Sequence, residues 1–408
     1  MRCRHCSAEL THTFIDLGSS PPSNAYIMKD ALQEAERWYP LKVMTCDRCW
    51  LVQTEDFVKA DEMFANDYAY FSSYSTSWLK HAKSYVEQVS SKFNLNSEST
   101  VVEIAANDGY LLQYVKDKNI PCYGIEPTHS TAQAAREKSI EIIEDFFGVE
   151  IASGLEKQGR QANLMVANNV LAHVPDINDF VKGFSILLKP NGVATFEFPH
   201  VLNLINNNQF DTIYHEHYSY LSLTAVRNIF EFNGLTVFNV EQIPTHGGSL
   251  RIYAQRSDLG SHKVNTNVVN LQRKEDQAGI SSIDIYQGFQ EKAEDIKVNF
   301  LSFLIKAKKN GLSVAGYGAA AKGNTLMNFS GVRPDLLAYV VDKSSVKQGK
   351  YMPGSRVPIV DEIQLKKDQP NYVVIFPWNI KNEVIEQLNY IKEWGGKFVI
   401  FIPSMQVI

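Results

Sequence analysis

The chain has 408 residues, of which 44% are hydrophobic and 21% are charged, and its formal net charge at pH 7 is -5. This length predicts two or three domains, and the composition is that of a globular protein rather than a disordered or fibrous one. The negative balance, without a basic tail or stripe, argues against nucleic acid as the main partner. The sequence lacks a run of 18 apolar residues, and it has Cys and His where a signal peptide needs an apolar core, so we expect a cytoplasmic protein without a membrane partner.

The first 65 residues contain two C-x-x-C pairs, Cys3 with Cys6 and Cys46 with Cys49. Paired spacing of this kind suits thiolate ligands in a reducing compartment better than disulfides. Two such turns can complete a tetrahedral site with no open position, so we expect a structural Zn²⁺ ion. His5 is expected to lie on the surface rather than to bind the metal. A redox-active pair or free thiols remain the alternative.

The stretch between residues 61 and 89 is rich in aromatic side chains and leads into a predicted helix. We expect most of its rings to pack in a seam between domains.

The strongest strand-turn-helix pattern is TVVEIAANDGY, from Thr100 to Tyr110. A strand rich in β-branched residues ends in a turn where Ala105, Ala106 and Gly109 leave the backbone amides open to a ligand. The alternative is that the small residues only let a helix pack on the sheet.

Further short strands follow at the spacing of a doubly wound parallel sheet, which binds its ligand at the carboxyl ends of the strands. The strand CYGIE ends at Glu126, which can accept hydrogen bonds from ribose hydroxyls, and EIIEDFF ends in residues suited to an adenine ring. ANLMVANNVLAHVPD ends in a polar loop that contains His173, and KPNGVATFEFP follows a Pro-Asn-Gly turn. LTVFNVEQI and SLRIYAQ are expected to form a final antiparallel hairpin. The predicted cofactor contacts are Glu103, Ala105, Asn107, Asp108, Gly109, Glu126, Pro127, Asp145, Phe146, Asn168 and Asn169.

Titratable side chains gather in FDTIYHEHYSYLS, from Phe210 to Ser222. His215, Glu216 and His217 stand together between tyrosines, but they lack the helical H-x-x-x-H spacing of a zinc site. His215 is expected to be structural.

Farther along, PTHGGSLRIY has two glycines that free backbone amides for a phosphate or a sugar. A simple hairpin bend remains the alternative. The candidate residues are His246, Gly247, Gly248, Ser249 and Arg251.

Residues 268–309 are predicted to be mostly helical, and a second α/β unit follows. In LSVAGYGAAAKGNTLMNF, the G-x-G pattern is similar to a dinucleotide fingerprint. Lys322 in the turn argues against a nicotinamide cofactor, although Asp342 ends the next strand. The loop at Pro377–Asn379 is expected to face the same cleft.

EIAANDGY, GIEP, EDFF, ANNVLAHVPD and KPNGVATFEFP together resemble the class I S-adenosylmethionine-dependent methyltransferase fold. With the other stretches, the chain from Cys3 to Pro403 resembles the bacterial nucleotide-sugar C-methyltransferases, which methylate C-3 of TDP-linked 4-keto deoxy sugars. The resemblance implies a zinc-binding domain at 1–65, a cofactor domain at 66–260, a Rossmann-like lobe for the nucleotide sugar at 261–408, and a monomer. Many relatives carry Gly where this chain has Ala105, and Ala fits there if its φ is negative.

The same resemblance assigns the reacting groups. A Tyr-x-Glu-His arrangement maps on Tyr214, Glu216 and His217, with His217 as the base and Glu216 as its orienting partner. Tyr214 is the second candidate for the base and otherwise a proton donor to the 4-oxygen, His173 reaches the ketone, and Tyr68 completes the lid. Tyr317, Lys322 and Asn324 are placed near the phosphates or the sugar. A methyltransferase for another nucleotide sugar, or a binding protein without chemistry, remains the alternative.

Overall fold

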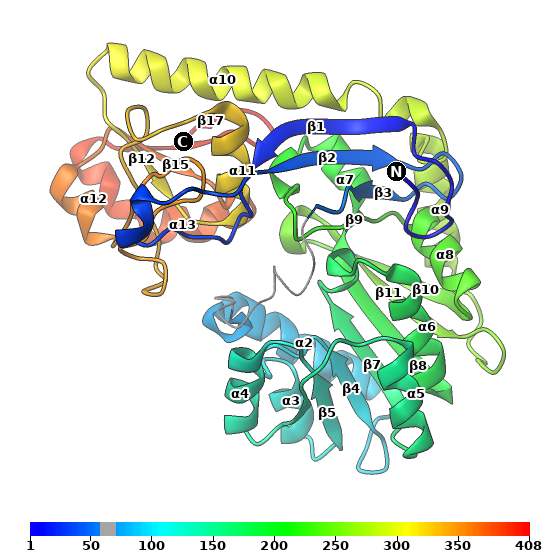
Figure 1. The fold of residues 1–408 in the computed structure, drawn as a ribbon. Coiled ribbons are helices and arrows are strands. Elements are labelled where there is room, and N and C mark those ends of the chain that lie inside the picture. Colours follow the sequence, from blue (N-terminus) through cyan, green and yellow to red (C-terminus); the bar gives the residue numbers. More distant parts are fainter. Residues whose placement is uncertain (58–70) are drawn as a thin grey trace.

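The computed structural model describes residues 1–57 and 71–408. Within these residues the strands form three sheets, drawn from the beginning, the middle and the end of the chain (Figure 1). All helices of the described part are too short or too polar to cross a membrane. Tyr68, predicted to complete the lid, lies outside the described residues.

The N-terminal sheet is antiparallel, with strand order β1-β2-β3-β9. Its first three strands are β1 (His12–Ser20), β2 (Tyr39–Thr45) and β3 (Val52–Thr54). The fourth strand, β9 (Ser219–Tyr220), comes from the stretch in which the titratable residues gather, and it pairs Tyr220 with Val52. The cysteine module is therefore joined by backbone hydrogen bonds to the predicted catalytic stretch.

The central sheet has the strand order β10-β11-β8-β7-β4-β5-β6. The strands from β4 to β8 run parallel, and β11 runs antiparallel between β8 and β10, which confirms the predicted doubly wound sheet with a final hairpin. The strands are β4 (Val101–Ile104), β5 (Cys122–Ile125), β6 (Glu141–Ile143), β7 (Ala162–Asn168), β8 (Leu188–Pro199), β10 (Leu235–Ile243) and β11 (Ser249–Arg256).

Helices cover both faces of this sheet, each with its own buried apolar cluster. One face carries α2 (Thr76–Lys92), α3 (Leu112–Asp117) and α4 (His129–Glu137). The other carries α5 (Val149–Lys157), α6 (Ile177–Leu187) and α8 (Leu223–Phe232), and α7 (Val201–Asn206) follows β8. Side-chain caps start several of them: Ser75 accepts from the Trp78 amide and Ser222 from the Ala225 amide.

The Pro-Asn-Gly segment predicted as a turn before the fifth strand lies inside β8. Pairing with β7 jumps from Ala162 opposite Leu188 to Leu164 opposite Val193. The three extra residues on β8 form a bulge, because Pro190 has no amide hydrogen to donate to a regular ladder.

The C-terminal lobe has a sheet of order β14-β13-β12-β15-β16-β17, parallel except for β17. Its strands are β12 (Val314–Tyr317), β13 (Val340–Val341), β14 (Ile359–Val360), β15 (Tyr372–Ile375), β16 (Lys397–Ile400) and β17 (Gln406–Val407). Its helices are α11 (Ala321–Ser330), α12 (Ile363–Asp368) and α13 (Lys381–Gln387).

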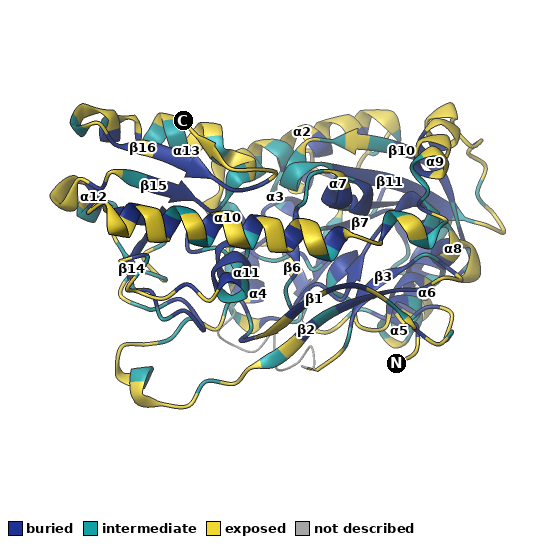
Figure 2. Ribbon diagram, turned by 90° about the horizontal axis from the view of Figure 1, so that it is seen from above, coloured by how far each residue is buried: buried dark blue, intermediate teal, exposed yellow. Residues whose placement is uncertain are grey.

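Two helices, α9 (Thr266–Ala278) and α10 (Phe289–Lys309), lead into this lobe, as the apolar spacing predicted. Figure 2 shows buried positions recurring along α10. Phe289 stacks on Phe14 of β1, with ring centroids 4.5 Å apart, and Phe300 packs against Phe401 at 4.6 Å. The helix therefore shares one apolar cluster with the N-terminal sheet and the C-terminal lobe.

Candidate active site

The four cysteines of the N-terminal module come together. Their sulfur atoms all lie within 4.8 Å of one another, with Cys3 and Cys49 at 3.5 Å and Cys6 and Cys46 at 3.5 Å. Because Zn–S bonds are about 2.3 Å long, a tetrahedral Zn²⁺ site has sulfur atoms about 3.8 Å apart, so this donor set fits zinc with every position filled by protein.

His5 was expected to lie on the surface, but the structure buries it. It is 9% exposed, its Nδ1 lies 2.8 Å from Asn178 Oδ1, and its ring meets Phe232 edge-on. The side chain fills the junction between the cysteine module and helices α6 and α8.

The turn after β4 has three residues in the left-handed region. Ala105 has φ of 53°, Asn107 of 50° and Gly109 of 74°. The negative φ at which Ala105 would fit without strain is not found, and the methyl group makes the observed conformation costly. The Asn107 amide donates to Glu126 Oε2 at 2.9 Å, which holds the turn against the end of β5.

Ala105→Gly should stabilise the fold by about 0.5–1 kcal/mol, because glycine relieves the left-handed strain and only part of that gain is offset by the freer unfolded chain. Denaturant unfolding measures this difference. The matched control is Ala106→Gly, at a fully buried neighbour that does not have a positive φ. This substitution should destabilise the fold. A loss of stability in the first variant would show that the turn does not carry this strain.

The predicted cofactor contacts line the carboxyl ends of adjacent parallel strands. Glu126 follows β5 and is 4% exposed, and its other oxygen accepts from the Thr128 amide at 2.9 Å. Asp145 and Phe146 follow β6, and the Phe146 ring is half-exposed, so one face is open to cover a ligand. At the end of β7, the buried Asn168 amide has no hydrogen-bond partner among the described residues, so a polar ligand group is needed there. These observations fit an adenosine-containing cofactor.

The remaining predicted cofactor residues lie beneath or beside the turn. Glu103 is buried within β4, and burial raises its pKa well above its ordinary value. Asp108 accepts from the Ser73 amide at 3.2 Å and pairs with Lys138 at 3.6 Å, while Pro127 is half-buried. Asn169, with φ of 56°, donates its backbone N–H to the Glu197 carbonyl at 2.7 Å.

Three of the four described side chains predicted to be catalytic lie together. The His217 ring packs at a tilt against that of Tyr214, with centroids 4.0 Å apart, and the ring of His173, in the short helix η3 (Leu171–His173), meets it edge-on at 4.7 Å. His217 Nδ1 lies 2.8 Å from the Thr212 carbonyl, in the short helix η4 (Phe210–Thr212). A carbonyl only accepts, so Nδ1 carries the hydrogen and Nε2 keeps its lone pair.

Burial keeps both imidazoles neutral. Burial and then the neighbouring His173 lower the pKa of His217 well below its ordinary value, and the charge of Lys322 acts in the same direction. Burial likewise lowers the pKa of His173 to about 4. A neutral imidazole with a free lone pair is the form a general base requires.

Glu216 does not orient His217, contrary to the prediction. Its carboxylate faces the N-terminal module, where Asn24 Nδ2 donates to both oxygens at 3.2 Å. The Thr212 carbonyl orients His217 instead. His215 is structural as expected, because its Nε2 contacts the carbonyls of Tyr39 and Pro40.

Burial raises the pKa of Glu216 from its ordinary 4.5 to about 7. Between these values the folded protein keeps a proton that the unfolded chain has lost, so this group makes stability fall as pH rises through the window. Glu216→Gln removes the ionisation, and we expect it to be more stable than the parent above pH 7 by up to about 3 kcal/mol, with the difference vanishing below pH 4.5. Unfolding free energies measured from pH 4 to 8 test this, and a pH-independent difference would contradict it.

Most of the residues predicted as a phosphate or sugar site in PTHGGSLRIY make packing contacts and hydrogen bonds within the protein. Ser249 donates to the Thr245 carbonyl at 2.9 Å, and the Arg251 guanidinium is buried against Glu197, with its Nε 2.6 Å from Oε1. A Cβ on Gly247 would lie 2.5 Å from Trp378 Cη2, and one on Gly248 2.4 Å from Asn203 Nδ2.

His246 of this group lies beside the predicted cofactor residue Asn169. It lies in the short helix η5 (Thr245–Gly247), its Nε2 is 3.4 Å from Asn169 Nδ2, and its ring is 5.5 Å from that of Trp78.

Lys322 of the C-terminal lobe lies over the Trp378 ring, with its Nζ 4.4 Å from the ring centroid, and the same ring covers Gly247 next to His246. Its ammonium adds to the lowering of the pKa of both His246 and His217, after burial. Asn324 is buried and donates to the Ser23 carbonyl, and Tyr317 donates to Gln387 Oε1 at 3.1 Å inside the lobe. The charge of Lys322 therefore acts on the predicted catalytic His217, whereas Tyr317 contacts a residue of its own lobe.

The turn after β12, whose G-x-G pattern is similar to a dinucleotide fingerprint, is held by side chains of this chain. Asp342 accepts from the Ala319 amide at 2.8 Å, while Tyr26 at 2.6 Å and Lys347 at 2.8 Å donate to the Ala319 carbonyl.

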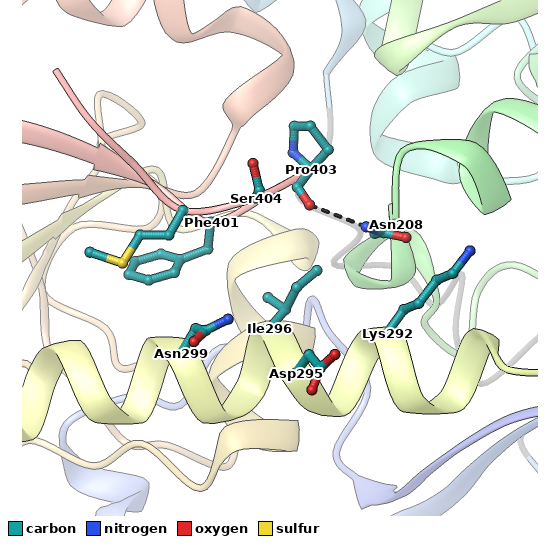
Figure 3. Close-up of a pocket in the computed structure, with 9 residues that line it drawn as sticks. Asn208, Lys292, Asp295, Ile296, Asn299, Phe401, Pro403 and Ser404 are labelled. Atoms are coloured by element: carbon teal, nitrogen blue, oxygen red, sulfur yellow. Dashed lines mark hydrogen bonds between the residues drawn. The ribbon is translucent and has the colours of Figure 1, made fainter.

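A separate pocket of about 190 Å³ lies between α10 and residues 401–405 (Figure 3). Asn208 donates to the Pro403 carbonyl across it at 3.3 Å. It is smaller than the roughly 300 Å³ at which small-molecule sites begin, and its lining contains no predicted site residue.

Sequence reasoning missed Asn24, Thr212 and Asp211. Asn24 carries no local signal, because its contact with Glu216 spans 192 residues. Asp211 and Thr212 lie inside the stretch of titratable residues from Phe210 to Ser222. The acidic side chain of Asp211 next to that cluster was a signal that could have identified it.

Comparison with known proteins covers nearly the whole chain. Family models match a zinc binding domain at residues 3–64, a methyltransferase domain at 78–240 and a C-methyltransferase C-terminal domain at 244–403. The chain is 31% identical over 406 residues to C-methyltransferase NovU of Streptomyces niveus, covering 100% of this chain and 96% of that protein.

Two solved structures of similar fold each match less than half of the chain. Magnesium protoporphyrin IX methyltransferase from Synechocystis PCC 6803 is 15% identical, with a TM-score of 0.34, over 44% of this chain and 79% of that one. The PH0226 protein of Pyrococcus horikoshii OT3 is 13% identical, with a TM-score of 0.38, over 46% and 94%.

Proposed function

Because the chain belongs to the family of C-methyltransferases that join a zinc-binding, a methyltransferase and a C-terminal C-methyltransferase domain, we propose that its substrate is a TDP-linked 4-keto deoxy sugar methylated at C-3. The boundaries proposed for these parts are residues 1–65, 66–260 and 261–408. S-adenosylmethionine is the cofactor, and the residues along the edge of the central sheet would hold it. Zinc is the structural metal held by the four cysteines.

A C–H bond beside a ketone is acidified but remains far less acidic than any side chain. The site must therefore remove the proton with a positioned base and stabilise the oxygen on which negative charge develops. His217 Nε2 is the proposed base, and Tyr214 and His173 are the groups beside it that can face the 4-oxygen. When bound, S-adenosylmethionine supplies an electrophilic methyl group to the carbanion, and positioning provides much of the rate.

The observation that carries this proposal is the neutral, buried His217, whose Nε2 is unprotonated and whose ring contacts Tyr214 and His173 where the C-terminal lobe brings in Lys322. Glu216 keeps a supporting place as the link from this loop to Asn24. Tyr68 remains a proposed lid residue on the strength of the family alone.

Incubation of the purified protein with a TDP-4-keto deoxy sugar in D₂O tests the base. Deuterium at C-3 supports proton abstraction there. Absence of exchange, with and without cofactor, would favour a binding protein without chemistry. Exchange seen only with a different nucleotide sugar would assign that sugar as the substrate instead.

A further inference from the structure

Asp211 is a buried carboxylate that the proposed mechanism does not use. It lies in η4, six residues before His217, and is 1% exposed. Its Oδ2 accepts from Trp378 Nε1 at 2.7 Å, whereas its Oδ1 has no hydrogen-bond partner among the described residues. Burying a carboxylate with an unpaired oxygen is costly, so a purely structural role explains it poorly.

Trp378 brings three segments together. It lies in the short helix η7 (Trp378–Ile380) of the C-terminal lobe, and its ring passes over Gly247, where even a methyl group would collide with it. On the same indole, Lys322 Nζ stands 4.4 Å from the ring centroid and donates to Asn379 Oδ1 at 2.6 Å. One turn farther along α11, Thr325 donates to the Ile213 carbonyl at 2.8 Å, so this helix is tied to the catalytic loop.

We infer that Asp211 is a positioning residue that fastens the Trp378 loop to the catalytic loop and keeps Lys322 in its ammonium form beside His217. The inference deepens the proposed function and rests on it for the role of Lys322, which would face the oxygens of the substrate. An ammonium group there stabilises developing negative charge and also keeps the neighbouring imidazoles unprotonated.

The charged and titratable groups around Lys322 come from three elements. Asp211 belongs to η4, His217 to the loop after it and His246 to η5, and the uncharged Trp378 and Asn379 complete the shell. Burial lowers the pKa of Lys322 to about 8, and the charge of Asp211 opposes that lowering. Without this carboxylate, the pKa of Lys322 falls further, and the ammonium is lost at a lower pH.

The test measures the titration of Lys322 in the full-length protein without substrate, by the rate of its acetylation with acetic anhydride as a function of pH. In Asp211→Asn, the labelling midpoint should move at least about one pH unit below that of the parent, a tenfold change in the protonation equilibrium. Asp335→Asn, which removes an exposed partner of Lys308, is the matched control and should leave the midpoint unchanged. An unchanged midpoint in Asp211→Asn would overturn the inference.

The pH profile of C-3 exchange gives the functional readout. Asp211→Asn should lose exchange on the alkaline side first, and Asp211→Asn with Lys322→Arg should regain it, because a guanidinium stays charged. Failure of this rescue would also overturn the inference. If Asp211→Asn does not fold, Trp378→Phe removes the hydrogen bond that favours the ionised Asp211, and its labelling midpoint should shift in the same direction. Since labelling needs no substrate, a wrong proposed function would leave that result standing.

Discussion

His217→Asn should abolish measurable exchange at C-3 of the sugar and lower methyl transfer by about 10²- to 10⁴-fold, the range expected when a general base is lost. Asparagine can still donate to the Thr212 carbonyl that holds His217 Nδ1, but it offers no basic nitrogen. Exchange is followed by NMR in D₂O and methyl transfer by mass spectrometry.

Cofactor affinity separates this effect from misfolding. His217 is not among the residues proposed to hold the cofactor, so the affinity for S-adenosylmethionine, measured by calorimetry, should stay within a few-fold of the parent. His215→Asn is the matched control and should keep exchange, because the Nε2 of this neighbouring imidazole contacts the backbone carbonyls of Tyr39 and Pro40. Retained exchange in His217→Asn would show that another residue is the base, and Tyr214 would be the next candidate.

Cys46→Ser should remove bound zinc and destabilise the protein by at least about 4 kcal/mol, as losing a structural metal does. The loss should also reach the active site. Gln53 donates to Cys3 Sγ at 3.3 Å, β3 pairs with β9, and Thr54 Oγ1 donates to the His217 carbonyl at 3.2 Å. Activity should therefore fall together with zinc content.

Metal analysis, thermal unfolding and the exchange assay make this comparison on one preparation. Cys122→Ser is the control, because this half-buried thiol lies in β5, apart from the four clustered sulfurs. It should keep full zinc and exchange. Full zinc content in Cys46→Ser would remove this residue from the ligand set.

Strong local patterns predicted the architecture. A run of β-branched residues marked the strand β4, and small residues marked the turns after β4 and β12, since both signals depend only on neighbouring residues. The paired cysteines likewise carry their spacing in the sequence.

The contacts that the sequence did not reveal are between distant segments. Glu216 meets Asn24 instead of His217, and Arg251 meets Glu197 instead of a phosphate, because a buried charge takes the partner that the tertiary fold supplies. The φ of Ala105 followed from the geometry of the turn rather than from its residue type. The two-residue strand β9 was too short for any periodic signal.

Transfer of a labelled methyl group tests the central claim most directly. The protein is incubated with [¹³C-methyl]-S-adenosylmethionine and a TDP-4-keto deoxy sugar, and the product is examined by carbon-correlated NMR. A labelled methyl bonded directly to C-3 is the predicted result. A methoxy signal, or no incorporation while zinc content and cofactor binding are intact, would contradict it.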